Sequence, residues 1–215
     1  WNSPNLTTVE MIFNNCKALT ELDVSNWNVS NAKYLNSMFY NCSSLTTLDV
    51  SNWDVSNVVN MKTLFQGCTS LTILDVSNWN TSKVTNMSYM FAQCTSLTTL
   101  DVSNWDVSKV TNMCSMFCGN SYASDMKIQV LDISKWDTSN VTDMSFMFYG
   151  CAGPGTVDVS NWDVSKVVTF DHMFAHSHLS GLDVSKWNTS SAENMNAMFH
   201  NTRNTVLDVS SFDTS

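Results

Sequence analysis

The side chains with the clearest chemical potential are aspartates that recur at one fixed place in the chain. Each follows a leucine or a valine, and each is followed by a serine two residues later. The eight are Asp23, Asp49, Asp75, Asp101, Asp132, Asp158, Asp183 and Asp208. Stacked about 5 Å apart, such carboxylates repel their neighbours by roughly 0.8 kcal/mol in water. Some other interaction must offset that repulsion.

Three interpretations of this candidate binding ladder stay open. Each carboxylate can accept hydrogen bonds from the serine two residues on, as an Asx-turn. Alternatively, Ca²⁺ or another hard cation can bridge adjacent carboxylates. The third interpretation is a docking surface for a basic protein partner. Further aspartates directly after the recurring aromatic residue extend the acidic band, and these are Asp54, Asp106, Asp137, Asp163 and Asp213.

Asparagine replaces aspartate after the aromatic residue in some repeats and then begins an N-x-Ser/Thr sequon. The candidate N-glycosylation residues are Asn5, Asn28, Asn41, Asn80, Asn86, Asn140 and Asn188. A chain rich in Asn, Ser and Thr also produces sequons by chance. If they carry sugars, that edge of the protein faces solvent in a secreted molecule.

Histidines and cysteines are candidate metal ligands, and cysteine is also a candidate nucleophile. His172 and His176 are four residues apart, a spacing that presents two metal ligands from one helical turn, and His178 lies close by. The H-E-x-x-H acid is absent, so an exposed polar loop is the competing interpretation. Five cysteines share one repeat position, where we expect buried thiols that act as small hydrophobes, with disulfides between rungs as the alternative. Cys114 and Cys118 could form a local disulfide. We find no phosphate-binding loop or nucleophile motif, and we expect no enzymatic activity.

These residues are positioned by internal repeats. The string Leu-Asp-Val-Ser-Asn-Trp at 22–27 returns at 48–53, 74–79 and 100–105, with variants after that. The aromatic anchors fall at 1, 27, 53, 79, 105, 136, 162, 187 and 212. We expect a single unit of eight repeats over 1–215, with an irregular insertion at about 119–127. It should be a segment of a longer array.

Two periodicities lie inside each repeat. In Leu-Asp-Val-Ser, apolar and polar residues alternate, which predicts a short strand, and stacked copies would form a parallel sheet. Further on, apolar residues such as Val58, Met61, Leu64 and Phe65 predict one face of a short helix or 3₁₀ segment. Serines such as Ser56 stand where that helix would need an N-cap.

The large apolar residues are interpreted mainly as core. The methionines follow the helical template, so packing is favoured over a binding groove. The tryptophans, one per repeat, are expected to stack and fix the register, and a carbohydrate-binding stripe would require rings that face outward.

The repeat resembles that of BspA-like surface leucine-rich-repeat proteins. The resemblance rests on M-F-x-x-C-x-S-L-T-x-L-D-V-S-N-W-D-V-S-N-V-T-N-M, as in 90–113 with Lys109 for the second Asn, and it extends over essentially the whole chain. It implies a leucine-rich-repeat-like solenoid, with a parallel β-sheet on one face and short helical or 3₁₀ segments on the other. It also implies an extracellular or cell-surface location and a role in adhesion. It brings no catalytic residues.

Composition narrows the function classes further. The formal net charge is −9, which repels nucleic acid and anionic membrane surfaces. No apolar run is long enough to span a bilayer, so we expect no membrane insertion. We therefore expect a non-enzymatic protein without a resident cofactor that recognises a protein partner. The alternative is a structural stalk or filament formed by head-to-tail stacking of copies, with or without a glycosylated coat.

Overall fold

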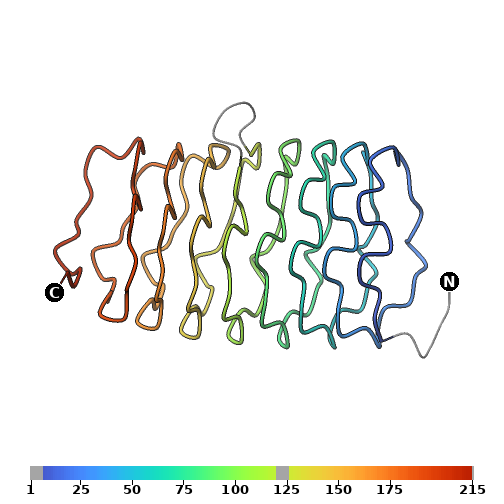
Figure 1. Ribbon diagram of the computed structural model, residues 1–215, viewed down its shortest axis with the longest axis horizontal. Coiled ribbons are helices and arrows are strands. Elements are labelled where there is room, and N and C mark those ends of the chain that lie inside the picture. Colours follow the sequence, from blue (N-terminus) through green and yellow to red (C-terminus); the bar gives the residue numbers. More distant parts are fainter. Residues whose placement is uncertain (1–6, 120–125, 215) are drawn as a thin grey trace.

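The chain winds into a row of similar coils that follow one another in sequence order along the long axis (Figure 1). This computed structural model describes residues 7–119 and 126–214. Each coil holds one repeat, and neighbouring coils lie side by side through residues 25 or 26 apart, as in the parallel pairing of Tyr34 with Asn60, or 31 apart across the insertion, where Asn112 pairs with Asp143. The repeat length of the sequence thus sets the period of the architecture.

The predicted leucine-rich-repeat-like solenoid, with its parallel sheet and helical segments, is wrong. Over residues 7–119 and 126–214 the chain forms no helix and no strand, only turns, bends and isolated parallel bridges. The bridges join Thr8 to Tyr34, Tyr34 to Asn60, Asn60 to Asn86, Asn86 to Asn112, Asn112 to Asp143, Asp143 to Thr169, Thr169 to Asn194, Thr47 to Ile73, and Ile73 to Thr99. Each is an isolated bridge with no second pairing beside it to extend it into a strand.

The helical prediction fails because one or two residues in each apolar segment are left-handed. Ser37 has a φ of 56° and Asn41 a φ of 54°, which no right-handed helix accommodates. Most other coils repeat this pair. The equivalents of Ser37 are Met11, Thr63, Tyr89, Ser115, Phe146, His172 and Ala197, and those of Asn41 are Asn15, Gly67, Gln93, Gly150, His176 and Asn201.

A chain of tight turns takes the place of the helix. Met38 N donates to Leu35 O at 3.2 Å, and Cys42 N donates to Phe39 O at 3.2 Å. In both turns the third residue has positive φ, the mark of a type II turn. The N–H groups between them point to the next coil, as where Phe39 N donates to Leu64 O at 3.0 Å. Backbone groups are therefore satisfied alternately within the coil and between coils.

The strand prediction fails because an indole spans the gap where a backbone ladder was expected. Trp79 Nε1 donates to Val50 O at 3.1 Å, and Trp105 Nε1 donates to Val76 O at 3.1 Å. The Trp53 and Trp79 rings are stacked with centroids 6.5 Å apart, more than the roughly 4.8 Å between paired strands. At this wider separation, backbone groups do not pair, and the indole N–H of the tryptophan side chain reaches the neighbouring coil in their place. The alternating pattern was nevertheless right about which side chains are buried.

The interior of every coil is apolar. Leucine, valine, methionine and phenylalanine fill it, and phenylalanines stack along the axis, with Phe39 and Phe65 centroids 5.7 Å apart. Tryptophans 53, 79, 105, 136, 162 and 187 are buried, as expected for core residues, and not turned outward as in a carbohydrate-binding stripe. No helix in the described part of the chain could cross a membrane.

Candidate functional site

Each ladder aspartate closes an Asx-turn with the serine two residues on. Ser51 donates to Asp49 Oδ1 through its backbone N–H at 3.1 Å and through its hydroxyl at 2.7 Å. The backbone bond recurs in all eight copies, and the hydroxyl bond recurs from Ser25 to Ser185. The turn bends the chain just before the tryptophan. It explains why aspartate and serine recur at this spacing.

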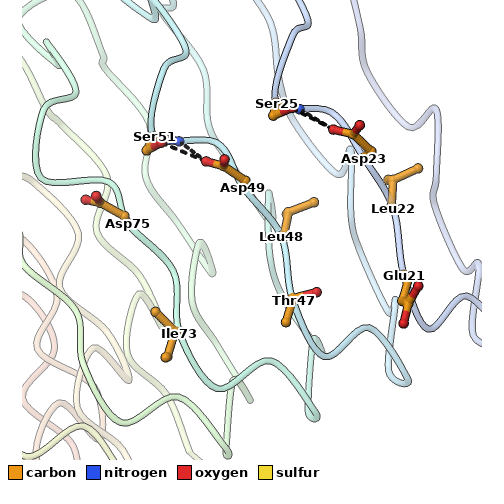
Figure 2. A pocket seen from close by; sticks show the side chains of 10 residues that line it. All are labelled: Glu21, Leu22, Asp23, Ser25, Thr47, Leu48, Asp49, Ser51, Ile73 and Asp75. Carbon is orange, nitrogen blue, oxygen red and sulfur yellow. Dashed lines mark hydrogen bonds between the residues drawn. The ribbon is translucent and has the colours of Figure 1, made fainter.

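The turns leave half of each carboxylate available. Within residues 7–119 and 126–214, the ladder aspartates accept hydrogen bonds through Oδ1 and make none through Oδ2. Asp23, Asp49 and Asp75 occupy equivalent places on three neighbouring coils, and all three are exposed (Figure 2). A file of outward carboxylate oxygens therefore runs along this side of the stack.

Hydrogen bonds favour the ionised form of six ladder carboxylates. Bonds from the serine hydroxyl, then from the serine N–H, hold the pKa values of Asp23, Asp49, Asp132, Asp158, Asp183 and Asp208 below the ordinary range. Neighbouring carboxylates act the other way, because the charge of Asp23 raises the pKa of Asp49. The ladder thus keeps its negative charge in spite of mutual repulsion.

Lysines accompany only some of the aspartates. In the second acidic row, directly after the tryptophans, hydrogen bonds from the following serine are the main cause of the lowered pKa values of Asp54, Asp106 and Asp163. Lys83, Lys109 and Lys166 lower these pKa values further. On the ladder, Lys135 and Lys186 act in the same way on Asp132 and Asp183. At the corresponding place beside the first four ladder aspartates the sequence has Asn26, Asn52, Asn78 and Asn104. Asp158 and Asp208 also lack this lysine, with Asn161 and Ser211 at its place, but the first four repeats form the longest run of ladder aspartates without it.

A shallow groove follows this part of the ladder. Its lining is Glu21, Leu22, Asp23, Ser25, Thr47, Leu48, Asp49, Ser51, Ile73 and Asp75 (Figure 2), and a second hollow continues it with Thr98, Thr99, Leu100, Asp101, Ser103, Gln129, Val130 and Asp132. We call the two together the acidic groove. Leucines form its floor and the ladder aspartates one edge. The other edge is formed by exposed Glu21, Thr47, Ile73, Thr99 and Val130. Ile73 is 65% exposed and Val130 is 75% exposed, so the second edge is partly apolar.

The sequon asparagines after tryptophan repeat the Asx-turn. Ser30 donates to Asn28 Oδ1, just as Ser56 donates to Asp54 Oδ1, in both cases at 3.0 Å. Asn80 and Asn188 do the same and are exposed. The turn needs only an acceptor oxygen, so asparagine and aspartate exchange here, and an N-x-Ser sequon follows wherever asparagine stands.

The remaining sequons occupy different places. Asn41 lies in the left-handed turn and donates to Asn15 Oδ1 at 3.1 Å. Asn86 accepts from Ser88 at an inter-coil bridge, and Asn140 donates to Ser108 O at 2.8 Å. Asn5 lies outside the described residues.

The predicted helical presentation of His172 and His176 is wrong, because both residues have positive φ. The His172 ring stacks on Phe146 with centroids 4.8 Å apart, and its Nδ1 lies 2.7 Å from Asp171 Oδ1. The His176 ring instead packs edge-on against Tyr149 and His200. His178 is half-buried. In the described parts of the chain, no three His, Cys, Asp or Glu side chains gather into a metal site.

The repeated cysteines lie inside the turns. The Cys42, Cys68 and Cys94 thiols are buried and donate to carbonyl oxygens 29 residues earlier, as from Cys68 Sγ to Phe39 O at 3.2 Å. Burial raises the pKa of Cys42 to about 11 and that of Cys94 to about 12. Cys16, Cys114 and Cys118 are free thiols as well. The expectation of buried thiols therefore holds for Cys42, Cys68, Cys94 and Cys151 but not for half-buried Cys16, and Cys114 and Cys118 form no disulfide.

Of the insertion predicted at about 119–127, residues 120–125 lie outside the described part. Gly119 packs so closely on the following coil that a Cβ there would come within 2.3 Å of Gly150 O. Met126 is buried. Both flanks of the insertion are thus tied into the stack.

Sequence reasoning missed the groove and the indole bonds. The pattern placed the aspartates on one file, but the apolar edge depends on which coil carries Ile or Val in place of Thr. That signal was present at Ile73 and Val130 and becomes meaningful only with the neighbouring coils in place.

A family model matches the chain three times, over residues 1–72, 46–128 and 120–215, in overlapping windows that fit an array of repeats. No curated protein and no solved structure matches it. The matched windows together span the chain, and the chain belongs to the family described as Mycoplasma protein of unknown function, DUF285.

Proposed function

We propose that this chain is a non-enzymatic recognition protein that binds a positively charged protein partner along the acidic groove. The observation that carries the proposal is the uncompensated charge of the first four ladder aspartates beside an exposed apolar edge. Opposite charge on a partner relieves the repulsion along the ladder and steers encounter. The exposed side chains of Ile73 and Val130 add apolar surface that a bound partner would remove from water.

We further propose that the protein works at the cell surface or outside the cell, in adhesion. The support is the likeness of the repeat to that of BspA-like surface proteins, carried by residues 90–113. Buried thiols and exposed sequon asparagines are compatible with that location. A bridging Ca²⁺ on the ladder is a lesser part of the proposal, since Oδ2 atoms are hard ligands.

Selection from a random peptide library on the immobilised chain tests this function. Enriched peptides should carry net positive charge and should bind an Asp75→Lys, Asp101→Lys variant at least about tenfold more weakly. An Asp54→Lys, Asp106→Lys variant changes the same charge outside the groove and should retain most of the binding. Enrichment of uncharged peptides, or equal binding to both variants, would count against the proposal.

A second candidate function is structural, as a stalk or filament segment. Continuous columns of stacked rings favour it, because stacked phenylalanines and tryptophans tie each coil to the next. If copies stack head to tail, sedimentation should show species that lengthen as concentration rises. A single monomeric species at every concentration would contradict it.

A further inference from the structure

We propose that the occupant of the acidic groove is an extended segment lying along the stack axis, with lysine or arginine at alternate positions. The inference rests on the proposed recognition function and specifies the conformation and charge spacing of the partner. It concerns the first four repeats, where the groove runs past Asp23, Asp49, Asp75 and Asp101.

The spacing of the coils suits an extended partner. The Trp53, Trp79 and Trp105 rings, each four residues after a ladder aspartate, are separated by 6.5 and 6.3 Å. Two residues before the ladder aspartates, Thr47 pairs with Ile73 in a parallel bridge, where neighbouring chains lie about 4.8 Å apart. The ladder aspartates stand in the chain between these two places, so their spacing falls between that of the bridge and that of the rings. In an extended chain, side chains on one side recur at about 6.6–6.8 Å, and a long lysine or arginine side chain absorbs a difference of up to about 2 Å per interval.

The two edges of the acidic groove differ. One edge presents the ladder carboxylates. The other begins at Glu21 and continues without charge through Thr47, Ile73 and Thr99 to Val130 of the fifth repeat. An extended segment sends successive side chains to opposite sides. Cations on one side would face the aspartates, while small or apolar side chains on the other would cover Ile73 and Val130.

The apolar floor of the acidic groove is too narrow for a helix. The apolar floor is a single file of leucines, and Leu48 and Leu100 are 5% and 4% exposed. A helix is about 10–12 Å across and would need a broad apolar strip to bury one face. An extended chain needs only a narrow channel.

Each ladder carboxylate is held in place by one oxygen and can bind a partner with the other. Oδ1 is held by the serine, which fixes the side chain, and Oδ2 makes no hydrogen bond among the described residues. A cation that reaches Oδ2 forms a charge-assisted bond without breaking the Asx-turn. The site is therefore pre-organised before a partner arrives.

The test compares three peptides of one composition by fluorescence anisotropy on the full chain. In the first, lysines alternate with valine and threonine. In the second, the lysines form one block, and in the third they stand at positions i, i+3 and i+4 of a helix. We expect the alternating peptide to bind about tenfold more tightly than the other two.

Paired variants locate the site. Asp49→Asn with Asp75→Asn removes two charges but keeps an acceptor for each turn, as Asn28 and Asn80 do elsewhere in the chain. We expect this pair to weaken the alternating peptide at least about fivefold. The matched pair Asp54→Asn with Asp106→Asn should change its affinity less than about twofold.

Each outcome has one meaning. Equal binding of the alternating and block peptides would overturn the extended register, yet leave recognition of basic partners intact if both depend on Asp49 and Asp75. Preference for the helical peptide would overturn the conformation. If the Asp54→Asn, Asp106→Asn variant lost affinity for the alternating peptide and the Asp49→Asn, Asp75→Asn variant did not, the placement of the site in the acidic groove would be overturned. If none of the three peptides bound, this inference would fail, and the library selection would decide the proposed function separately.

Discussion

The indole of Trp79 donates a hydrogen bond to the carbonyl oxygen of Val50 in the preceding coil at 3.1 Å. The same oxygen accepts the backbone N–H of Trp53, also at 3.1 Å. One carbonyl thus closes the turn of its own repeat and receives the side chain of the next. This double use is how the coils hold together on a side where no backbone ladder forms.

Replacing Trp79 should separate the contributions of stacking and hydrogen bonding. Trp79→Phe keeps an aromatic ring between Trp53 and Trp105 but removes the N–H, and should cost about 1–2 kcal/mol. Trp79→Leu also loses the stacking and leaves a cavity, and should cost about 3 kcal/mol or more. Urea denaturation of the two variants measures both values. A phenylalanine variant as stable as the parent would contradict the role given to the indole bond.

Aspartate and asparagine should be interchangeable in the turns after tryptophan. Asp54→Asn keeps an acceptor for Ser56 and should leave the stability at pH 7 nearly unchanged. Asp54→Ala removes the acceptor and should cost about 1 kcal/mol. Thermal melts compare the two variants. If asparagine proved as damaging as alanine, charge and not turn geometry would explain this position.

Stability should fall in acid. Because serine bonds lower the folded-state pKa of aspartates such as Asp49 and Asp158, their contribution is complete above about pH 4, the unfolded value, and is lost as the pH falls through the lowered folded values. Melting temperatures from pH 7 down to pH 2 should therefore drop below about pH 4. Asp49→Asn should reduce the size of that drop. A melting temperature that rose on acidification would show that repulsion along the ladder dominates.

Thiol reactivity should divide the cysteines by burial. Cys42, Cys68 and Cys94 are buried and have raised pKa values, so a thiol reagent at pH 8 should modify them only after unfolding. Half-buried Cys16 should react faster. Mass spectrometry of peptides after brief labelling identifies the modified sites. Rapid labelling of Cys68 in the folded protein would contradict the packing described.

The sequence predicted the repeat, the buried side chains and the Asx-turn, because these depend on residue type at a fixed spacing. Val58, Met61, Leu64 and Phe65 are buried as expected. They do not form a helix, because Thr63 between them has a positive φ. The spacing of apolar residues does not reveal whether a backbone φ is positive or negative. Likewise, alternation in Leu-Asp-Val-Ser indicated which side chains face inward, but not that the Trp79 indole would occupy the place of a ladder.

For the candidate site, the sequence supplied the file of aspartates but not its surroundings. Lys83 acts on Asp54 from the following coil, 29 residues further along the chain. Ile73 and Val130 lie next to ladder aspartates in the sequence, but they share one edge of a groove only when the coils are stacked. The groove and part of the charge compensation therefore depend on the three-dimensional arrangement.

The most direct test of the acidic groove is a backbone amide NMR titration of the chain with the alternating-lysine peptide. Ser51, Ser77 and Ser103 donate their N–H groups to ladder carboxylates and report on any cation that arrives there. Ser56 and Ser108 make the same bond to Asp54 and Asp106, on the second acidic row. We predict shifts for the first three amides and little change for the other two. Equal shifts in both sets, or shifts only at Ser56 and Ser108, would contradict the account.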